Sequence, residues 1–212
     1  MKEIDTFINY LAEFPIPDSK SLNLYSGNYK ESEIRRENLR FYLNKMREFN
    51  PTRILIGEAP GHNGCFITGI PFTDEFTMNT NHFFDNVIKC PLNKRPQKEM
   101  TASVIWDCLN KIPIEKYPLM WNIYPFHPSY VDSSHLMSTE RGNRAPNRIE
   151  CNVGKDILVK LLDLFDIKQF YAVGCKSRDK LKSEYKVQYM RHPSRGGANI
   201  FREQFNNIYN NE

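Results

Sequence analysis

An alternation of two apolar patterns constrains the fold of this chain most strongly. Short runs rich in β-branched and aromatic residues are predicted as strands at 53–57, 118–123, 169–174 and 187–191. Segments with apolar residues at helical spacing separate or follow them, near 80–90, 101–111, 149–165, 176–184 and 198–209. Strands that alternate with helices pair in parallel, with helices on both faces of the sheet. The sequence therefore predicts an α/β fold around a parallel sheet.

Two more helices are predicted ahead of the first strand, at 3–14 and 31–49, with a Ser-Gly-Asn turn between them. A chain of 212 residues with 40% hydrophobic residues suits one domain with a single core. We therefore expect a single domain over 1–212, with residues 1–50 as a helical segment packed on it.

Composition argues against membrane and disulfide-stabilised classes. No run approaches the roughly 18 uninterrupted apolar residues of a membrane span. Acidic residues stand near the N-terminus, at Glu3 and Asp5, where a signal peptide is basic and then apolar. The 5 cysteines form an odd set without close pairs, which argues for a reducing compartment. We expect a cytoplasmic monomer with no membrane partner.

The positive charge of the chain is concentrated near its C-terminal end. The net charge of +4 is modest and does not by itself indicate a nucleic-acid partner. Residues 176–202, however, hold eight Lys and Arg against two acidic residues, so that 8 − 2 gives a local +6. A surface of this charge attracts a phosphate backbone, and DNA is the partner it favours.

Two short motifs follow predicted strands directly. Gly57-Glu58-Ala59-Pro60-Gly61 comes after the first strand and forces a tight turn that presents backbone N–H groups. His192-Pro193-Ser194 comes after the last strand and leads into a loop with two glycines. Because parallel strands bind ligands at their carboxyl ends, both motifs are candidates for one site.

Four motifs in this order resemble the uracil-DNA glycosylase superfamily, over about residues 53 to 205. They are Gly57-Glu58-Ala59-Pro60-Gly61, Gly69-Ile70-Pro71-Phe72-Thr73, Asn122-Ile123-Tyr124-Pro125 and His192-Pro193-Ser194. The closer likeness is to prokaryotic branches with a first motif of the GEAPG type. The resemblance implies a three-layer α/β/α sandwich with a central four-stranded parallel sheet. It also implies a monofunctional enzyme of base excision repair that hydrolyses the N-glycosidic bond of uracil in DNA and leaves an abasic site.

The resemblance implies roles for the residues that bind the base, which must leave the DNA stack to react. Phe72 matches the ring that stacks on the extruded base, and Asn122 matches the amide that reads the base edge. His192 matches the donor to the carbonyl oxygen on which charge develops. Gly57 and Ala59 are expected to border the base.

The motifs do not single out one residue that would orient or deprotonate the attacking water. The best-known branch has Asp at the position of Ala59, and alanine can neither orient nor deprotonate water. Glu58 is the first candidate, because iron–sulfur relatives also have Glu there. Asp74 and Glu75 follow, because another branch has Asp shortly after the Pro-Phe-Thr run. Such a carboxylate can also act by stabilising a cationic sugar.

The loop after the last strand is the expected DNA contact. Ser194, Arg195 and Gly196 correspond to the loop that relatives press into the minor groove, and Arg191 flanks the histidine motif. Ile200 and Phe201 are the candidates for an apolar wedge, although their helical spacing is more typical of core residues.

No cofactor is expected. Among the four cysteine positions of the iron–sulfur branch, only that of Cys151 is matched, and Phe126 stands at another. We therefore predict no cluster, no other metal and no organic cofactor. No Lys lies in a motif, so strand cleavage through a Schiff base is not expected.

Three alternatives remain open at the level of sequence. Ala59 and the altered first loop are compatible with another deaminated base, such as hypoxanthine. The missing Asp is compatible with a catalytically silent member that binds nucleic acid. A pocket for a free nucleotide or small anion is the third. The irregular segment 125–148 is expected to order on contact with DNA.

Overall fold

A computed structural model describes residues 2–18, 20–27, 30–84, 96–130 and 144–210 of the chain. Its centre is a parallel sheet in the order β3-β2-β5-β6. The strands are β2 (Arg53–Gly57), β3 (Leu119–Asn122), β5 (Gln169–Val173) and β6 (Val187–Met190). The predicted strands are thus confirmed within one residue at each end.

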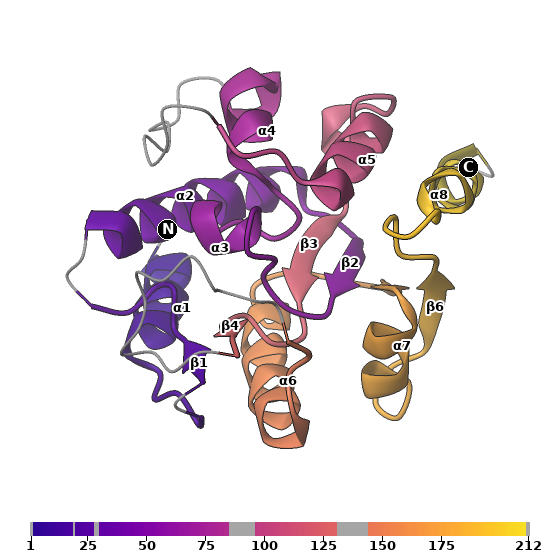
Figure 1. Ribbon diagram of the computed structural model, residues 1–212. Coiled ribbons are helices and arrows are strands. Elements are labelled where there is room, and N and C mark those ends of the chain that lie inside the picture. Colours follow the sequence, from indigo (N-terminus) through magenta and orange to yellow (C-terminus); the bar gives the residue numbers. More distant parts are fainter. Residues whose placement is uncertain (1, 19, 28–29, 85–95, 131–143, 211–212) are drawn as a thin grey trace.

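Helices cover both faces of this sheet (Figure 1). One face carries α2 (Lys30–Phe49), α5 (Met100–Leu109) and α8 (Ala198–Asn210). The other carries α1 (Lys2–Glu13), α6 (Arg148–Leu162) and α7 (Cys175–Leu181). The three-layer α/β/α sandwich with a four-stranded parallel sheet is therefore confirmed.

Aromatic side chains fill the core on both sides of the sheet. Trp106 of α5 packs against Phe83 with ring centroids 5.3 Å apart, and Phe83 stacks on Tyr117 at 5.8 Å. Phe7 of α1 contacts Trp121 of β3 at 5.8 Å, so the first helix lies directly against the sheet. Each such ring is buried, and burying one stabilises the fold by about 1.5–3 kcal/mol.

The segment between β2 and α5 departs from the predicted helix near 80–90. It contains α3 (Cys65–Thr68), α4 (Glu75–Thr80) and the short 3₁₀ helix η1 (His82–Phe84). Asp74 caps α4 by accepting a hydrogen bond from the Thr77 N–H at 2.7 Å, which is why the helix begins earlier than its apolar pattern suggests. Residues 85–90 of the predicted helix lie outside the described residues.

A second, two-stranded sheet was missed by the sequence patterns. β1 (Ser21–Leu22) pairs antiparallel with β4 (His127–Pro128), so the segment after β3 is tied to the N-terminal region. Both strands have two residues, too few for a period to show. The predicted irregular segment 125–148 is thus partly a strand, and its residues 131–143 lie outside the described residues. The 3₁₀ helix η2 (Ile114–Lys116) precedes β3.

The first turn of α6 is capped by hydrogen bonds, and one of its residues is also bound by the N-terminal segment. Asn147 and Glu150 form a reciprocal capping box. Arg144 contacts both Glu150 oxygens at 2.6 Å, and Ser21 donates to the same carboxylate. Burial of Glu150 opposes its ionisation, but these donors outweigh burial and lower its pKa.

In the described part of the chain, no helix is both long and apolar enough to cross a membrane.

Candidate functional site

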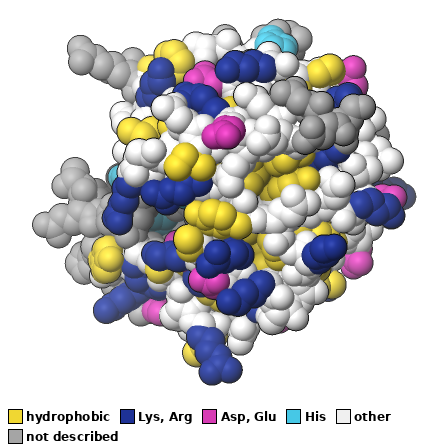
Figure 2. Space-filling model, turned by 90° about the vertical axis from the view of Figure 1, so that its right-hand side faces the viewer, with side chains coloured by type: hydrophobic (Ala, Val, Ile, Leu, Met, Phe, Trp, Pro, Cys, Tyr) yellow, Lys and Arg dark blue, Asp and Glu magenta, His cyan; other side chains and the backbone are white. Residues whose placement is uncertain are grey.

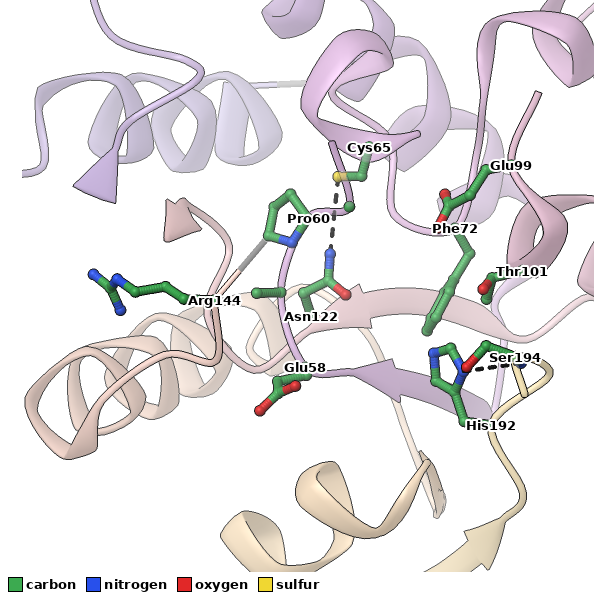
Figure 3. A pocket seen from close by; sticks show the side chains of 12 residues that line it. Glu58, Pro60, Cys65, Phe72, Glu99, Thr101, Asn122, Arg144, His192 and Ser194 are labelled. Atoms are coloured by element: carbon green, nitrogen blue, oxygen red, sulfur yellow. Dashed lines mark hydrogen bonds between the residues drawn. The ribbon is translucent and has the colours of Figure 1, made fainter. Parts of the chain in front are cut away.

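A cavity of about 310 Å³ opens at the carboxyl ends of β2 and β3 and beside the loop that follows β6 (Figure 3). Segments far apart in the sequence line it: Glu58, Ala59, Pro60, Gly61, Cys65, Phe72, Glu99, Thr101, Asn122, Arg144, His192 and Ser194. The structure thus brings together residues of all four sequence motifs. The lining residues that were not among the predicted site residues are Pro60 and Gly61 of the first motif, and Cys65, Glu99, Thr101 and Arg144.

Phe72 is held in an uncommon backbone conformation. Its φ of 54° lies in the left-handed region, which costs a bulky residue about 1–3 kcal/mol. The Trp106 indole donates to its carbonyl oxygen at 3.1 Å and helps to hold it there. Gly57 makes room for the ring, because a Cβ on Gly57 would lie 2.6 Å from Phe72 Cζ. Gly57 thus does not line the cavity itself but leaves the space that the Phe72 ring occupies.

Asn122 ends β3 directly beside Gly57 in the parallel register. It is buried, and its amide lies 3.8 Å from Cys65 Sγ, a weak hydrogen bond. A Cβ on Gly57 would also meet its Oδ1 at 2.6 Å. The Asn122 amide therefore reaches the cavity over the glycine, with a donor and an acceptor on one side chain.

His192 leaves β6 and is oriented by the residues that follow it. The Ser194 backbone N–H donates to Nδ1 at 3.2 Å, and Ser194 Oγ lies 2.8 Å from the same nitrogen. A neutral ring that accepts at Nδ1 carries its proton on Nε2. Gly197 allows the loop to fold back, because a Cβ there would lie 2.0 Å from the His192 carbonyl oxygen.

Burial keeps this histidine neutral near pH 7. Burial, followed by the charge of Arg191, lowers the pKa of His192 from its usual 6.5, and Glu58 offsets only part of this. The ring therefore offers an Nε2–H donor without a positive charge. A neutral donor of this kind stabilises charge that appears only during a reaction.

Glu58 lines the cavity but is engaged in ion pairs. Lys180 Nζ lies 3.1 Å from its Oε1, and Lys176 Nζ lies 3.6 Å from Oε2. Lys180 also donates to the Pro146 carbonyl at 3.3 Å. These contacts connect α7 to the turn after β2 and turn the Glu58 carboxylate toward the lysines.

Asp74 and Glu75 do not line the cavity. Both are buried, and their carboxylates accept hydrogen bonds from backbone N–H groups of the segment before α5. Asp74 accepts from the Glu99 N–H at 2.6 Å, and Glu75 accepts from the Gln97 N–H at 2.9 Å. These acids position the segment that carries Glu99, and their predicted contact with water is not supported by this placement.

Glu99 brings a carboxylate into the cavity. It stands immediately before α5, and most of it is buried there. Burial, together with the charge of Asp74, raises the pKa of Glu99 from 4.5 to about 7. Nothing in the sequence around Glu99 marked it, because it belongs to no motif and precedes an ordinary helical pattern.

The loop after His192 is largely exposed and basic. Arg195 and Gly196 have positive φ values of 52° and 77°, and Arg191 Nη2 donates to the Arg195 carbonyl at 3.4 Å. None of these three lines the cavity, although Ser194 does. Of the two wedge candidates, Phe201 is buried in the core, whereas Ile200 is 49% exposed. The expectation that both belong to the core is therefore wrong for Ile200.

Metal ligands do not gather in the described part of the chain. No group of three His, Cys, Asp or Glu side chains there is placed to hold an ion. Cys151 is buried, with Sγ 3.7 Å from the Pro146 carbonyl. Phe126 packs on Phe14 with centroids 5.7 Å apart. The functional groups that line the cavity include a phenyl ring, an amide, an imidazole, two carboxylates, a guanidinium, a thiol and two hydroxyls.

Comparison with known proteins gives a structural likeness. No protein-family model matches this chain, and no curated protein sequence matches it. The crystal structure of wild-type SMUG2 from Pedobacter heparinus is similar, with a TM-score of 0.71 over 99% of each chain. The sequence identity is 20%. At this identity the likeness shows that the two proteins share a fold.

Proposed function

We propose that this protein is a DNA glycosylase that hydrolyses the N-glycosidic bond of uracil in DNA and leaves an abasic site. The observation that carries the proposal is the convergence of Phe72, Asn122 and His192 on one cavity at the carboxyl edge of the sheet. The four motifs and the fold shared with SMUG2 support it.

The size of the cavity suits one extruded nucleoside. At about 310 Å³ it lies near the lower end of the range for ligand pockets, which is about 300–1,000 Å³. Phe72 offers a ring for stacking, worth about 1–3 kcal/mol per base. The buried Asn122 amide offers a donor and an acceptor, complementary to the adjacent acceptor and donor on the uracil edge.

Departure of the base is assisted by His192 in this proposal. As the bond to the sugar breaks, negative charge develops on the pyrimidine carbonyl oxygen. The neutral imidazole donates its Nε2–H to that oxygen. By analogy with oxyanion donors, such a hydrogen bond lowers the activation free energy by about 3–4 kcal/mol.

The DNA backbone is proposed to lie across the basic face formed by α7, β6 and the loop before α8. Figure 2 shows that Lys and Arg side chains outnumber acidic ones on this face. Arg191, Arg195 and Gly196 belong to this loop, close to His192 in the sequence, and exposed Ile200 follows them. We further propose that the protein acts as a single-domain monomer over 1–212 and without a metal or cofactor.

Base release tests this function directly. Single- and double-stranded oligonucleotides carrying uracil or hypoxanthine are incubated with the wild-type protein, and released base is measured. We expect release of uracil, and a loss of about 100- to 1,000-fold in His192→Ala. His82→Ala is the matched control, because His82 is exposed and does not line the cavity. Release of hypoxanthine alone would reassign the base.

A second candidate is a catalytically silent protein that binds damaged DNA. The observation that favours it is the pairing of Glu58 with two lysines, together with Ala59 at the usual acid position. Tight binding to uracil-containing or abasic duplex without release of either base would support this candidate and contradict the first.

A further inference from the structure

Glu99 enters the cavity from the side opposite His192 and Ser194. Figure 3 shows its carboxylate pointed inward, above the Phe72 ring. In the described parts of the chain, its side-chain oxygens take part in no hydrogen bond or ion pair; only its backbone N–H and carbonyl do. A largely buried carboxylate without a protein partner, facing a cavity, is placed to act on what the cavity holds.

Two glycines leave room for this side chain, and one aspartate binds the backbone that carries it. Cβ atoms on Gly61 and Gly64 would lie 2.9 Å from Oε1 and 2.0 Å from Oε2 of Glu99. The turn after β2 therefore closes over the carboxylate only because both positions lack a side chain. Asp74 accepts from the Glu99 N–H at 2.6 Å and fixes the backbone from the other side.

Burial and the charge of Asp74 both favour the protonated form of Glu99, so that it ionises only near neutrality. Asp74 faces it from the start of α4, and Cys65 from α3. Glu58, Arg144 and His192 line the same cavity, and burial lowers the pKa of His192. With its pKa raised to about 7, Glu99 is a base matched to near-neutral conditions.

We propose that Glu99 is the catalytic carboxylate that takes a proton from the attacking water, an inference that rests on the proposed function. The water oxygen bonds to the sugar C1′ while the bond from C1′ to the base nitrogen breaks, and that electron pair leaves with the base. One water proton passes to Glu99, the base anion, held by the His192 donor, takes a proton from solvent on release, and Glu99 returns its proton to solvent. The products are free base and an abasic sugar, and Glu58 serves as the ion-paired contact to α7.

The pH dependence of single-turnover base release tests this assignment. We expect the wild-type rate to rise with pH through about 7, as Glu99 loses its proton. Glu99→Gln is expected to lose about 100- to 10,000-fold at pH 8 and to lack the rise, with uracil-DNA affinity changed by less than about threefold. Glu99→Asp keeps a carboxylate and should retain an intermediate rate and the rise.

Two comparisons separate the possible outcomes. Glu58→Gln is expected to lose less than about tenfold and to keep the pH rise, and Glu115→Gln, at an exposed position in η2, is the control for the substitution itself. Thermal unfolding shows that each variant is folded. A Glu99→Gln rate within about tenfold of wild type, or a pH rise that disappears only in Glu58→Gln, would overturn the inference while leaving the function intact. No base release by the wild type would instead contradict the proposed function.

Discussion

At the scale of single residues, the cavity depends on backbone positions that tolerate few alternatives. Phe72 has a positive φ, and its ring lies over Gly57 together with the Asn122 amide. Non-glycine residues in this region persist only when their surroundings hold them, and they concentrate at functional sites. Here the Trp106 hydrogen bond and the absence of a side chain on Gly57 hold the ring.

Gly57→Ala tests this arrangement. The new Cβ would lie 2.6 Å from both Phe72 Cζ and Asn122 Oδ1, so both side chains must shift. Because small displacements of positioning groups cost about 100-fold in rate, we expect base release to fall by at least that factor. Circular dichroism should show an intact fold. Activity within about threefold of wild type would show that neither side chain needs its present position.

At the scale of secondary-structure elements, short segments support the site through contacts at their ends. α7 presents Lys176 and Lys180, one helical turn apart, to Glu58. α6 begins at the capping box of Asn147 and Glu150, and Arg144 connects this box to the cavity lining. α7 is therefore connected to the turn after β2, and the start of α6 to the cavity lining.

Removal of the Asn147 cap of α6 measures how much the cap contributes to stability. Asn147→Ala deletes the acceptor for the Glu150 N–H, which lies 2.9 Å away, and is expected to lower the free energy of unfolding by about 1 kcal/mol. Asn152→Ala is the matched control, because Asn152 is exposed inside the same helix and alanine favours helix there. Urea unfolding checks both. Equal losses in the two variants would show that the cap contributes nothing specific.

At the scale of the whole molecule, the sheet order places the cavity. β2 lies between β3 and β5, so the connection from β2 to β3 and the connection from β5 to β6 run in opposite directions. Ligands of open α/β sheets bind in such a crevice, at the carboxyl ends of the strands. The turn after β2, the end of β3 and the loop after β6 meet there. The buried acid held in this crevice weakens the fold at neutral pH.

The stability of the whole chain should therefore depend on Glu99. Its pKa is raised from 4.5 to about 7 in the folded state, so its contribution to stability is full below pH 4.5 and is lost as pH rises through 7. Glu99→Gln, which resembles the protonated form, should be more stable than wild type by about 2 kcal/mol at pH 8 and similar at pH 4.5. Unfolding by urea at both pH values checks this. An equal difference at both would exclude ionisation as the cause.

The strands, most helices and the motif positions of this protein follow from its sequence alone. These features rest on short-range patterns: runs such as 53–57 read as buried strands wherever they lie, and the glycines and prolines after them end a strand in any context. Asn122 and His192 reach one cavity because parallel strands bring their carboxyl ends together, and Phe72 reaches it from the segment between α3 and α4. Two-residue strands and the early start of α4 were beyond such patterns.

Only the tertiary structure decided which carboxylate lines the cavity without a hydrogen bond or ion pair among the described residues. Glu58, Asp74 and Glu75 each stood at a position that the sequence favoured, yet their carboxylates bind lysines or backbone N–H groups. Glu99, outside every motif, lies in the cavity because Asp74 holds its backbone and Gly61 leaves it space. The protonation of a carboxyl group depends on burial and on neighbouring charge, and both come from residues distant in the chain.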